Sequence, residues 1–442
     1  MRSGLNLISL LILPVIFAAA ASDEWPDFRG PDGQGHSDSK GLPVTWSESQ
    51  NAVWKTAIPG TGWSSPVVSG DEIWLTTAVE AEKPDAGTPP STFDYKSPKP
   101  GSGTKVYPKP LSFRAICVSF QSGKIIKNVE VFFIEKPGNI HERNSYASPS
   151  PVLEKNRLYV HFGTYGTACV STPDSKVLWR NDEMKLEHQN GPGGSPVLYK
   201  DKLLFCCDGM DVQYMAALFT ETGKIAWKTT RSVPVTKAED MRKAYGTPLV
   251  ATIDGQDEVI TPAADCLYSY NPADGKELWH LKYVGFSNVA RPVYDGKFLY
   301  ISTGFMNPEM WAIKPEGKGE LTPDKVVWKD KVQASRQTSP VLSGNRMYMF
   351  SDSGIVRCLE AATHKELWRE KIAADAAASP LVADGKVYFF DSREAGTVVE
   401  DSETYKLLAK NTLDDGFMAS PAVVGKSLVL RTKKSLYRIE SK

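Results

Sequence analysis

The sequence has no net charge and little of the chemistry that holds metals or haem. Lys and Arg number 52 and Asp and Glu also number 52, so the chain lacks the basic surface that attracts nucleic acid or an anionic membrane. Six cysteines and six histidines occur, without the Cys-x-x-Cys-His spacing of a haem site or a Cys and His spacing suited to zinc. We therefore expect no nucleic-acid partner, and we assign no metal site.

Long apolar runs are missing everywhere except near the N-terminus. Residues 1–21 combine Arg2, an apolar stretch over 5–17 and four alanines at 18–21. This is the pattern of a cleaved signal peptide rather than of a membrane span. No cysteine follows the alanines, so we expect no lipid anchor. We predict a periplasmic or secreted protein without a transmembrane segment.

A short pattern, usually Ser-Pro followed by two apolar residues, recurs through the rest of the chain. After one long first interval, its copies are 40 to 52 residues apart. Self-similarity at such a period indicates a repeat fold, and the chain is longer than one compact core usually allows. The eight copies, two of them variants, begin at Ser65, Ser150, Ser195, Thr247, Arg291, Ser339, Ser379 and Ser420.

One repeat contains four short strand signals. Within residues 340–369, apolar runs at 341–343, 346–350, 355–359 and 366–369 are separated by turn residues. Four short antiparallel strands form a sheet of the size of one propeller blade. We therefore predict an all-β fold, an eight-bladed β-propeller of four-stranded antiparallel blades.

The propeller is expected to occupy residues 51–442. The last repeat, over 421–438, has only three strands, and residues 51–56 supply the fourth, so that an N-terminal strand closes the ring and removes exposed edges. Residues 22–50 are expected to form an irregular arm across the propeller surface. Residues 79–112, rich in Pro, Gly and Lys, are predicted to be a long loop insertion in the first blade, and a role in docking a partner stays open.

Two recurring positions are interpreted as packing. A tryptophan fills the last strand of most repeats, where its ring can wedge between neighbouring blades. Seven residues before the lysine of the last turn, a second position accepts only Cys, Ala or Ser, which indicates a small buried side chain. The tryptophans are Trp54, Trp179, Trp227, Trp279, Trp328 and Trp368, and the small residues are Cys117, Cys169, Ala217, Ser269 and Cys358.

The segments that end in tryptophan resemble a known motif. Residues 217–227 read Ala-Leu-Phe-Thr-Glu-Thr-Gly-Lys-Ile-Ala-Trp, which is similar to the docking motif Ala-x-Asp-x-x-Thr-Gly-x-x-x-Trp of quinoprotein propellers, with Phe219 in place of Asp. The chain thus resembles the pyrroloquinoline-quinone (PQQ)-like β-propeller superfamily. The resemblance implies one of two functions, because that superfamily includes quinone-dependent alcohol dehydrogenases and the non-catalytic propeller subunit of the outer-membrane β-barrel assembly machine.

The adjacent cysteines Cys206 and Cys207 bear on this choice. Many quinone-dependent alcohol dehydrogenases have a strained disulfide between adjacent cysteines near the quinone, and the resemblance allows such a vicinal disulfide. Neighbouring side chains of a regular strand point to opposite faces, however. We therefore favour one thiol inside the blade and one outside.

The loops that enter the innermost strands are expected to share one face of the ring, around the mouth of the central channel. Polar side chains that converge on a channel mouth are the best candidates for a site that binds a protein or small-molecule ligand. These candidates are His141, Arg143, Asn144, Tyr146, His188, Asn190, Tyr245, Asn288, Arg291, Arg336 and Gln337.

We interpret the protein as a monomeric, non-enzymatic binding or scaffold protein that uses this face and assign no cofactor to it. The interblade loops are mostly short, and no catalytic residue can be assigned. The alternative is a PQQ- and Ca²⁺-dependent periplasmic alcohol or sugar dehydrogenase. Asp208, Asp211, Asp265 and Asn288 have the chemistry of its base or metal ligands.

Overall fold

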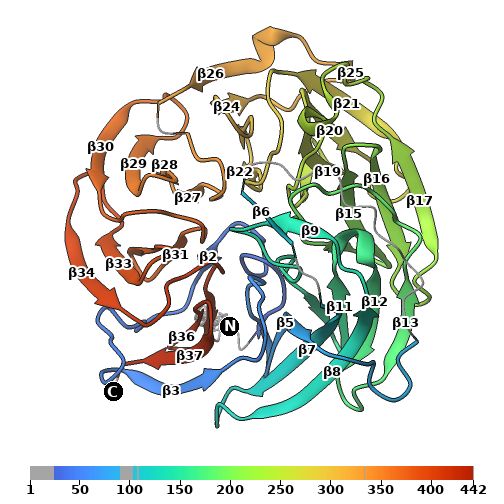
Figure 1. Ribbon diagram of the computed structural model, residues 1–442. Coiled ribbons are helices and arrows are strands. Elements are labelled where there is room, and N and C mark those ends of the chain that lie inside the picture. The colour runs from blue at the N-terminus through green and yellow to red at the C-terminus, as the bar shows by residue number, and fades with distance from the viewer. Residues whose placement is uncertain (1–23, 90–102, 107–108, 333, 442) are drawn as a thin grey trace, which may run out of the picture.

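A computed structural model shows the chain as a ring of eight antiparallel sheets (Figure 1), which confirms the predicted all-β, eight-bladed β-propeller. The structure describes residues 24–89, 103–106, 109–332 and 334–441, so the predicted signal peptide lies outside the described residues. No helix in the described ranges is long and apolar enough to cross a membrane. The short 3₁₀ helices that interrupt the loops are η1 (Gly163–Tyr165), η2 (Glu239–Met241) and η3 (Pro323–Lys325).

Each blade runs from an innermost strand beside the channel to an outermost strand at the rim. Blade 1 consists of β4 (Val67–Ser69), β5 (Glu72–Glu80), β7 (Leu111–Ser119) and β8 (Ile125–Ile134), and blade 2 of β10 (Val152–Glu154), β11 (Arg157–His161), β12 (Thr167–Ser171) and β13 (Val177–Asn181). Blade 3 consists of β14 (Val197–Tyr199), β15 (Lys202–Asp208), β16 (Gln213–Phe219) and β17 (Ile225–Thr230), and blade 4 of β18 (Leu249–Ile253), β19 (Gln256–Ala263), β20 (Cys266–Tyr270) and β21 (Glu277–Lys282).

The second half of the ring repeats this arrangement. Blade 5 consists of β22 (Val293–Tyr294), β23 (Leu299–Ser302), β24 (Met310–Ile313) and β26 (Val326–Asp330), and blade 6 of β27 (Val341–Ser343), β28 (Arg346–Phe350), β29 (Ile355–Glu360) and β30 (Glu366–Lys371). Blade 7 consists of β31 (Leu381–Ala383), β32 (Lys386–Phe390), β33 (Ala395–Glu400) and β34 (Leu407–Thr412), and blade 8 of β35 (Ala422–Val424), β36 (Ser427–Arg431), β37 (Ser435–Glu440) and β3 (Ala52–Ala57). Short additional strands are β1 (Glu24–Trp25) on β4, β2 (His36–Ser37) on β31, β25 (Gly319–Glu320) on β21, and the pair β6 (Thr104–Val106) and β9 (Asn139–His141).

The N-terminal strand β3 closes the ring, as predicted. It pairs antiparallel with β37, where Trp54 faces Arg438 and Thr56 faces Leu436. The backbone N–H of Glu440 donates to the carbonyl oxygen of Asn51 at 2.9 Å, so the last strand of the chain and the closing strand lie side by side. The eighth blade therefore joins the two ends of the described chain, and each of the eight blades has four strands.

The recurring tryptophans connect neighbouring blades. The indole Nε1 of Trp54 in blade 8 donates to the carbonyl oxygen of Phe120 in blade 1 at 2.9 Å. A Cβ on Gly123, whose φ is +72°, would lie 2.7 Å from the Trp54 ring, so the ring covers a turn that only glycine fits. Four further tryptophans donate in the same way to a carbonyl of the next blade, namely Trp179, Trp227, Trp328 and Trp368.

Trp279 differs because the next blade has a longer turn there. That turn contains β25, which pairs with β21 directly opposite Trp279, and the indole is completely buried. Its Nε1 donates instead to the carboxylate of Glu258 in its own blade at 2.8 Å. In four of these blades the small residue of the second recurring position faces the tryptophan across the strand pair, as Cys358 faces Trp368, which explains why this position stays small.

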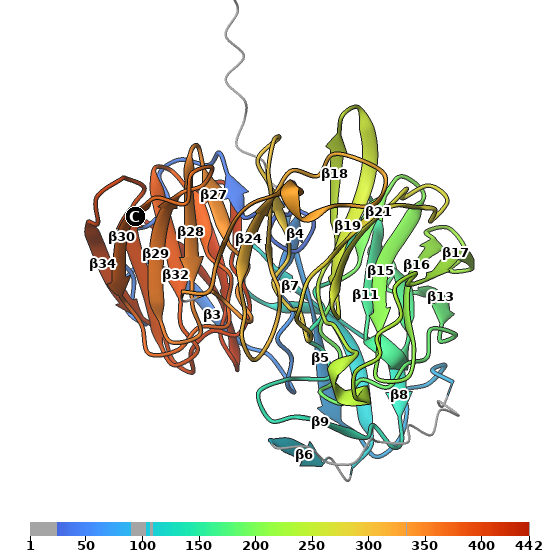
Figure 2. The ribbon, with the colours of Figure 1, turned by 90° about the horizontal axis from the view of Figure 1, so that it is seen from above.

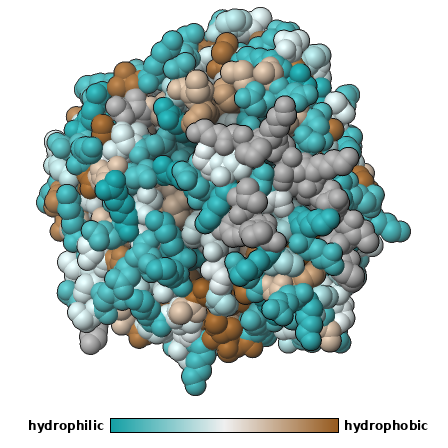
Figure 3. Space-filling view, in the orientation of Figure 1, coloured by the Kyte–Doolittle hydropathy of each residue, from teal (hydrophilic) through white to brown (hydrophobic). Residues whose placement is uncertain are grey.

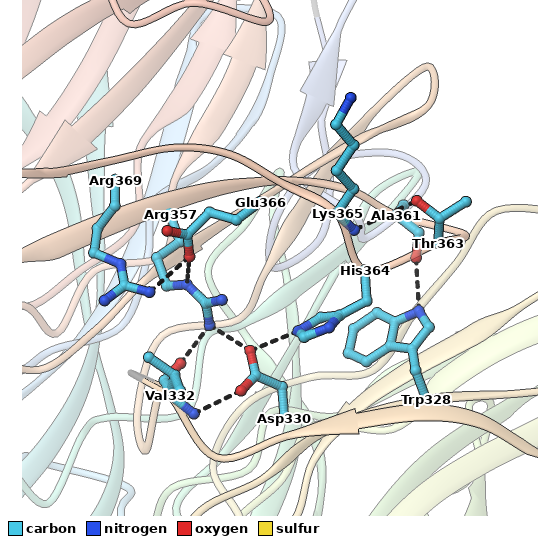
Figure 4. A network of polar contacts seen from close by, with 10 residues as sticks. All are labelled: Trp328, Asp330, Val332, Arg357, Ala361, Thr363, His364, Lys365, Glu366 and Arg369. Atoms are coloured by element: carbon cyan, nitrogen blue, oxygen red, sulfur yellow. Dashed lines mark hydrogen bonds and ion pairs between the residues drawn. The ribbon is translucent and has the colours of Figure 1, made fainter.

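Ion pairs add to the joint between blades 5 and 6 (Figure 4). Arg357 of β29 donates through Nη1 to Asp330 of β26 at 2.5 Å, and His364 lies 2.7 Å from the same carboxylate. Burial alone would raise the pKa of Asp330, but hydrogen bonds from Val332, Arg357 and His364 outweigh it and hold this pKa below its usual value. Neighbouring blades are therefore joined by polar contacts as well as by packing.

Hydroxyl groups at the start of the innermost strands link the blades into an inner ring. The backbone N–H of Ser65 donates to Oγ of Ser150 at 2.9 Å, and that of Ser420 donates to Oγ of Ser65 at 3.0 Å, which joins the last blade to the first. The remaining links run in the same direction and end at Oγ of Ser195, Oγ1 of Thr247, and Oγ of Ser339, Ser379 and Ser420. We call these seven side chains the hydroxyl ring; its eighth position holds Arg291, which has no hydroxyl.

Removing one hydroxyl from this ring should destabilise the propeller. The substitution Ser379→Ala leaves the buried N–H of Ser339 without its acceptor, and we expect the free energy of unfolding to fall by about 1–3 kcal/mol. Chemical denaturation measures this loss. Ser49→Ala, at an exposed serine outside the ring, is the control and should change stability by less than about 0.5 kcal/mol; equal losses in both variants would contradict a structural role for the ring.

We predicted that the N-terminal arm lies across the propeller surface. The arm instead enters the channel. β1 pairs with β4 of blade 1 and β2 pairs with β31 of blade 7, so the segment between them passes along the inner edges of the blades. Arg291 donates through Nη1 to the carbonyl oxygen of Phe28 at 2.8 Å. The physical reason is that innermost strands have unpaired backbone groups, which the arm satisfies while it buries Trp25.

The insertion in the first blade is shorter than predicted. β5 extends to Glu80 and β7 begins at Leu111, so their paired ends fall inside the segment 79–112 that we expected to be a loop. Of the intervening residues, 90–102 and 107–108 lie outside the described ones. The described part contains β6, which pairs with β9, and Figure 2 shows this two-stranded ribbon projecting from one face of the ring.

Candidate ligand-binding cavity

A cavity of about 700 Å³ occupies the centre of the ring. The loops that precede the innermost strands of all eight blades contribute to its wall, as the common position of the Ser-Pro repeats predicted. The β6 and β9 ribbon stands beside it, since His141 of β9 lines the cavity. Figure 3 shows the face of the molecule that is turned to the viewer in Figure 1, and hydrophilic residues predominate on its visible part, with apolar residues in small separate groups.

Seven of the eleven residues predicted for the site line the cavity. They come from four different loops, so the structure gathers residues that are up to about 200 positions apart in the sequence. The seven are His141, Arg143, Asn144, Asn190, Tyr245, Arg336 and Gln337.

The other four, Tyr146, His188, Asn288 and Arg291, are buried behind the cavity wall. The Nε2 atom of His188 accepts a hydrogen bond from the backbone N–H of Thr164 at 2.8 Å, and burial lowers the pKa of His188 to about 3, so the ring is neutral. Asn288 donates to the hydroxyl of Tyr283 at 2.9 Å and to the carbonyl oxygen of Ser302 at 3.2 Å. None of these four side chains lines the central cavity.

The floor of the cavity combines the hydroxyl ring with the tip of the arm. All seven hydroxyl-ring side chains line the cavity, and so does Phe28. Arg291, at the eighth position, turns away from the cavity and holds the backbone of Phe28. The arm thus contributes Phe28 to the wall of the cavity.

Sequence reasoning missed an apolar part of the wall. Trp63, Phe286, Phe305 and Met306 line the cavity, and the side chains of Phe305 and Met306 are 44% and 56% exposed. Trp63 lies two positions before Ser65, so the repeat itself placed it in an entry loop. Phe305 and Met306 lie in the loop between β23 and β24, and nothing in the repeat pattern indicates that this loop reaches the mouth.

The arginines at the rim of the cavity are partly neutralised by neighbouring carboxylates. Arg143 pairs with Asp375 at 2.7 Å, whereas Nε of Arg336 is 3.7 Å from Asp352. The Arg336 guanidinium also lies 5.3 Å from the centre of the Phe305 ring, within reach of a cation–π contact. Burial raises the pKa of Asp352 above its usual value.

Lys243 adds a buried cation to the residues that line the cavity. Its side chain is almost completely buried, donates to the backbone carbonyl oxygen of Asp240 and lies 5.7 Å from the centre of the Phe286 ring. Burial lowers the pKa of Lys243 to about 8, although the charge of Asp240 acts in the opposite direction. The amine is therefore mostly protonated at neutral pH, and three cations face the cavity together with one carboxylate, that of Asp240.

The adjacent cysteines lie in the continuous strand β15 and are both free. Cys206 and Cys207 face Met215 and Tyr214 of β16, and the sulfur of Cys206 is 2.8 Å from Oγ1 of Thr261. Burial raises the pKa of Cys206 to about 11. The geometry matches separate thiols on the two faces of a regular strand, and neither cysteine lines the central cavity.

The proposed Ca²⁺ ligands do not come together. Asp208 forms a buried ion pair with Arg231, Asp265 accepts from Lys237 at 2.6 Å, and Asp211 accepts from the N–H of Glu187 at 2.8 Å. Asn288 is buried in the wall, and within the described ranges no group of three His, Cys, Asp or Glu residues is placed to hold a metal ion. The residues present do not fit a quinone held together with Ca²⁺, so we derive no step through that cofactor.

Comparison with solved structures shows the same fold in proteins of different function. A europium-containing methanol dehydrogenase matches with a TM-score of 0.63 and 10% identity, over 92% of this chain and 89% of its own. The quinohemoprotein alcohol dehydrogenase from Comamonas testosteroni gives a TM-score of 0.62 and 11% identity, over 96% and 82%. The computationally designed protein Ika8 gives 0.54 and 11%, over 90% and 100%. At these identities the likeness concerns the fold alone.

Sequence comparison identifies a family. No curated protein sequence matches the chain. One family model, described as outer membrane protein assembly factor BamB, matches residues 166–319 and 319–404. These two segments cover more than half of the chain and include strands of blades 2 to 7. The protein therefore belongs to this family of PQQ-like β-propellers.

Proposed function

We propose that the protein is a non-enzymatic binding protein that acts outside the cytoplasm and takes its ligand in the central cavity. The cavity has the size of sites that hold small organic molecules, and such sites combine apolar walls with a few oriented polar groups. Trp63, Phe286 and Phe305 supply apolar surface, and Arg143 and Arg336 supply charge. A small molecule and a side chain of a partner protein would contact this same part of the cavity wall.

One observation carries the non-enzymatic part of the proposal. In the described part of the chain, no serine or threonine that lines the cavity is hydrogen-bonded to a histidine or a carboxylate, which is the arrangement that activates a hydroxyl nucleophile. His141, the histidine of the cavity wall, accepts through Nδ1 from the backbone N–H of Arg143 at 3.2 Å. This arrangement supports ligand binding rather than catalysis by an activated hydroxyl.

The alternative of a quinone-dependent dehydrogenase gives the sharpest test. The full chain is incubated with PQQ and Ca²⁺, and reduction of an artificial electron acceptor is followed with a panel of alcohols and sugars. We expect no reduction that depends on PQQ, because the carboxylates suited to Ca²⁺ are engaged in ion pairs and backbone contacts. A quinoprotein alcohol dehydrogenase serves as the positive control, and substrate-dependent reduction by the loaded protein would overturn the proposal.

A further inference from the structure

The hydroxyl ring has hydrogen-bond donors that the fold does not use. Each of its seven oxygens accepts an N–H from the preceding blade, as Oγ1 of Thr247 does from Ser195. Within the described residues, none of the seven hydroxyls donates a hydrogen bond to another protein group. A hydroxyl carries one hydrogen to donate besides its acceptor sites, so seven O–H groups are left over.

These donors are buried and face one place. The ring side chains are between 2% and 5% exposed, and all of them line the floor of the cavity. Buried polar groups normally have a hydrogen-bond partner, and leaving a donor without one is unfavourable. Because the ring oxygens are already acceptors for backbone N–H groups, the matching partner on the cavity side is a group that accepts hydrogen bonds.

The charged residues of the cavity wall indicate which kind of hydrogen-bond acceptor the cavity would bind. Arg143, Lys243 and Arg336 line the cavity together with Asp240, whereas Asp375 and Asp352, the carboxylates beside Arg143 and Arg336, do not line it. Oriented donors in a site that excludes water stabilise a negatively charged oxygen more than a neutral one. Trp63 and Phe286 also line the cavity, and their aromatic surface suits an apolar body.

From this arrangement we infer that the ligand of the cavity is an organic acid, whose carboxylate sits over the hydroxyl ring while its apolar body packs against Trp63 and Phe286. The inference rests on the proposed function and names the class of its ligand. A carboxylate can belong to a free organic acid or to the C-terminus of a polypeptide. Both present the same two oxygens to the ring, and the test distinguishes them.

The test compares matched pairs of probes by isothermal titration calorimetry on the full chain. 2-Naphthoate and its neutral isostere 2-naphthamide represent a free acid, and N-acetyltryptophan and N-acetyltryptophan amide represent a chain terminus. We expect at least one acid to bind about tenfold or more tightly than its amide, because hydrogen bonds to a charged group are the stronger ones. The pair that shows the difference identifies the source of the carboxylate.

Two sets of variants locate the effect. Arg336→Gln removes an exposed rim cation and should reduce the preference for the acid several-fold, whereas Lys406→Gln, which removes a cation outside the cavity, should leave it unchanged. Thr247→Val removes one ring hydroxyl at constant shape and should also weaken the preference, and Thr247→Ser should keep it. Arg336→Gln keeps the test informative if Thr247→Val fails to fold.

The outcomes separate this inference from the proposed function. Equal affinity for acid and amide, no binding of any probe, or a preference that survives both Arg336→Gln and Thr247→Val would overturn the assignment of an organic acid. Binding of the neutral amides alone would also overturn the assignment of an organic acid, but the proposed binding function would still hold. Quinone-dependent turnover, in contrast, would overturn the proposed function whatever the probes show.

Discussion

Removal of the closing strand β3 should abolish cooperative folding of the whole propeller. A chain that begins at residue 58 lacks the outer strand of blade 8 and the Trp54 contact with blade 1. The ring then has an open edge on β37 and an uncovered turn at Gly123. Domains are stable by only about 5–15 kcal/mol, so losing an interblade joint together with a full strand pairing consumes most of this margin.

A circular permutant supplies the matched control. In it, residues 51–57 follow residue 441 through a short turn, so that β37 and β3 form a hairpin while the arm is absent, as in the truncated chain. The adjacency of Glu440 and Asn51 makes this connection possible without strain. We expect the permutant to unfold cooperatively on heating and the truncated chain to aggregate or unfold without a sharp transition. Equal stability of the two proteins would contradict closure by β3.

Asp208→Asn should be among the most destabilising single substitutions. Asp208 and Arg231 are joined by two hydrogen bonds of 2.9 and 2.6 Å, and both side chains are nearly inaccessible. Burial alone would lower the pKa of Arg231, but the charge and hydrogen bonds of Asp208, together with the neighbouring Tyr270 and Cys206, outweigh it and hold this pKa above its usual value. Removing one partner of a buried ion pair leaves the other charge uncompensated and costs about 3–5 kcal/mol.

This substitution also decides whether Asp208 is a structural or a metal-binding residue. Asp414→Asn, which breaks the exposed pair with Lys55, is the control and should cost less than about 1 kcal/mol. Thermal unfolding with and without millimolar Ca²⁺ measures both effects. We expect Ca²⁺ to leave the unfolding temperature of the unsubstituted protein unchanged. Stabilisation by Ca²⁺ that disappears in Asp208→Asn would contradict the structural role.

Much of the fold could be predicted from the sequence because its signals are local and repeated. The turn residues and apolar runs of residues 340–369 match β27 to β30, and the incomplete last repeat pointed to closure by the strand of Trp54. Each repeat restates the same pairing, so an error in one copy is corrected by the others. The arm could not be placed in this way, because its segment occurs once and its partners, such as Val68 and Val382, are distant in sequence.

The candidate site was predictable as a location and less so in detail. The position of the Ser-Pro repeats identified the entry loops, but whether a side chain there faces the cavity depends on the path of each loop. His188 turns back to accept from Thr164, while Asn190, two positions later, reaches the cavity. Lys243 and Phe28 escaped prediction because their roles depend on burial and on the inserted arm, which a repeat pattern does not encode.

A crystal structure of the full chain with the acid probe that binds more tightly than its amide would show both where the ligand binds and which of its atoms contacts the hydroxyl ring. We expect the carboxylate to lie within hydrogen-bond distance of ring hydroxyls such as those of Thr247 and Ser379, with the aromatic body of the probe against Trp63. A probe bound outside the central cavity, or seated with its apolar end on the hydroxyl ring, would contradict it.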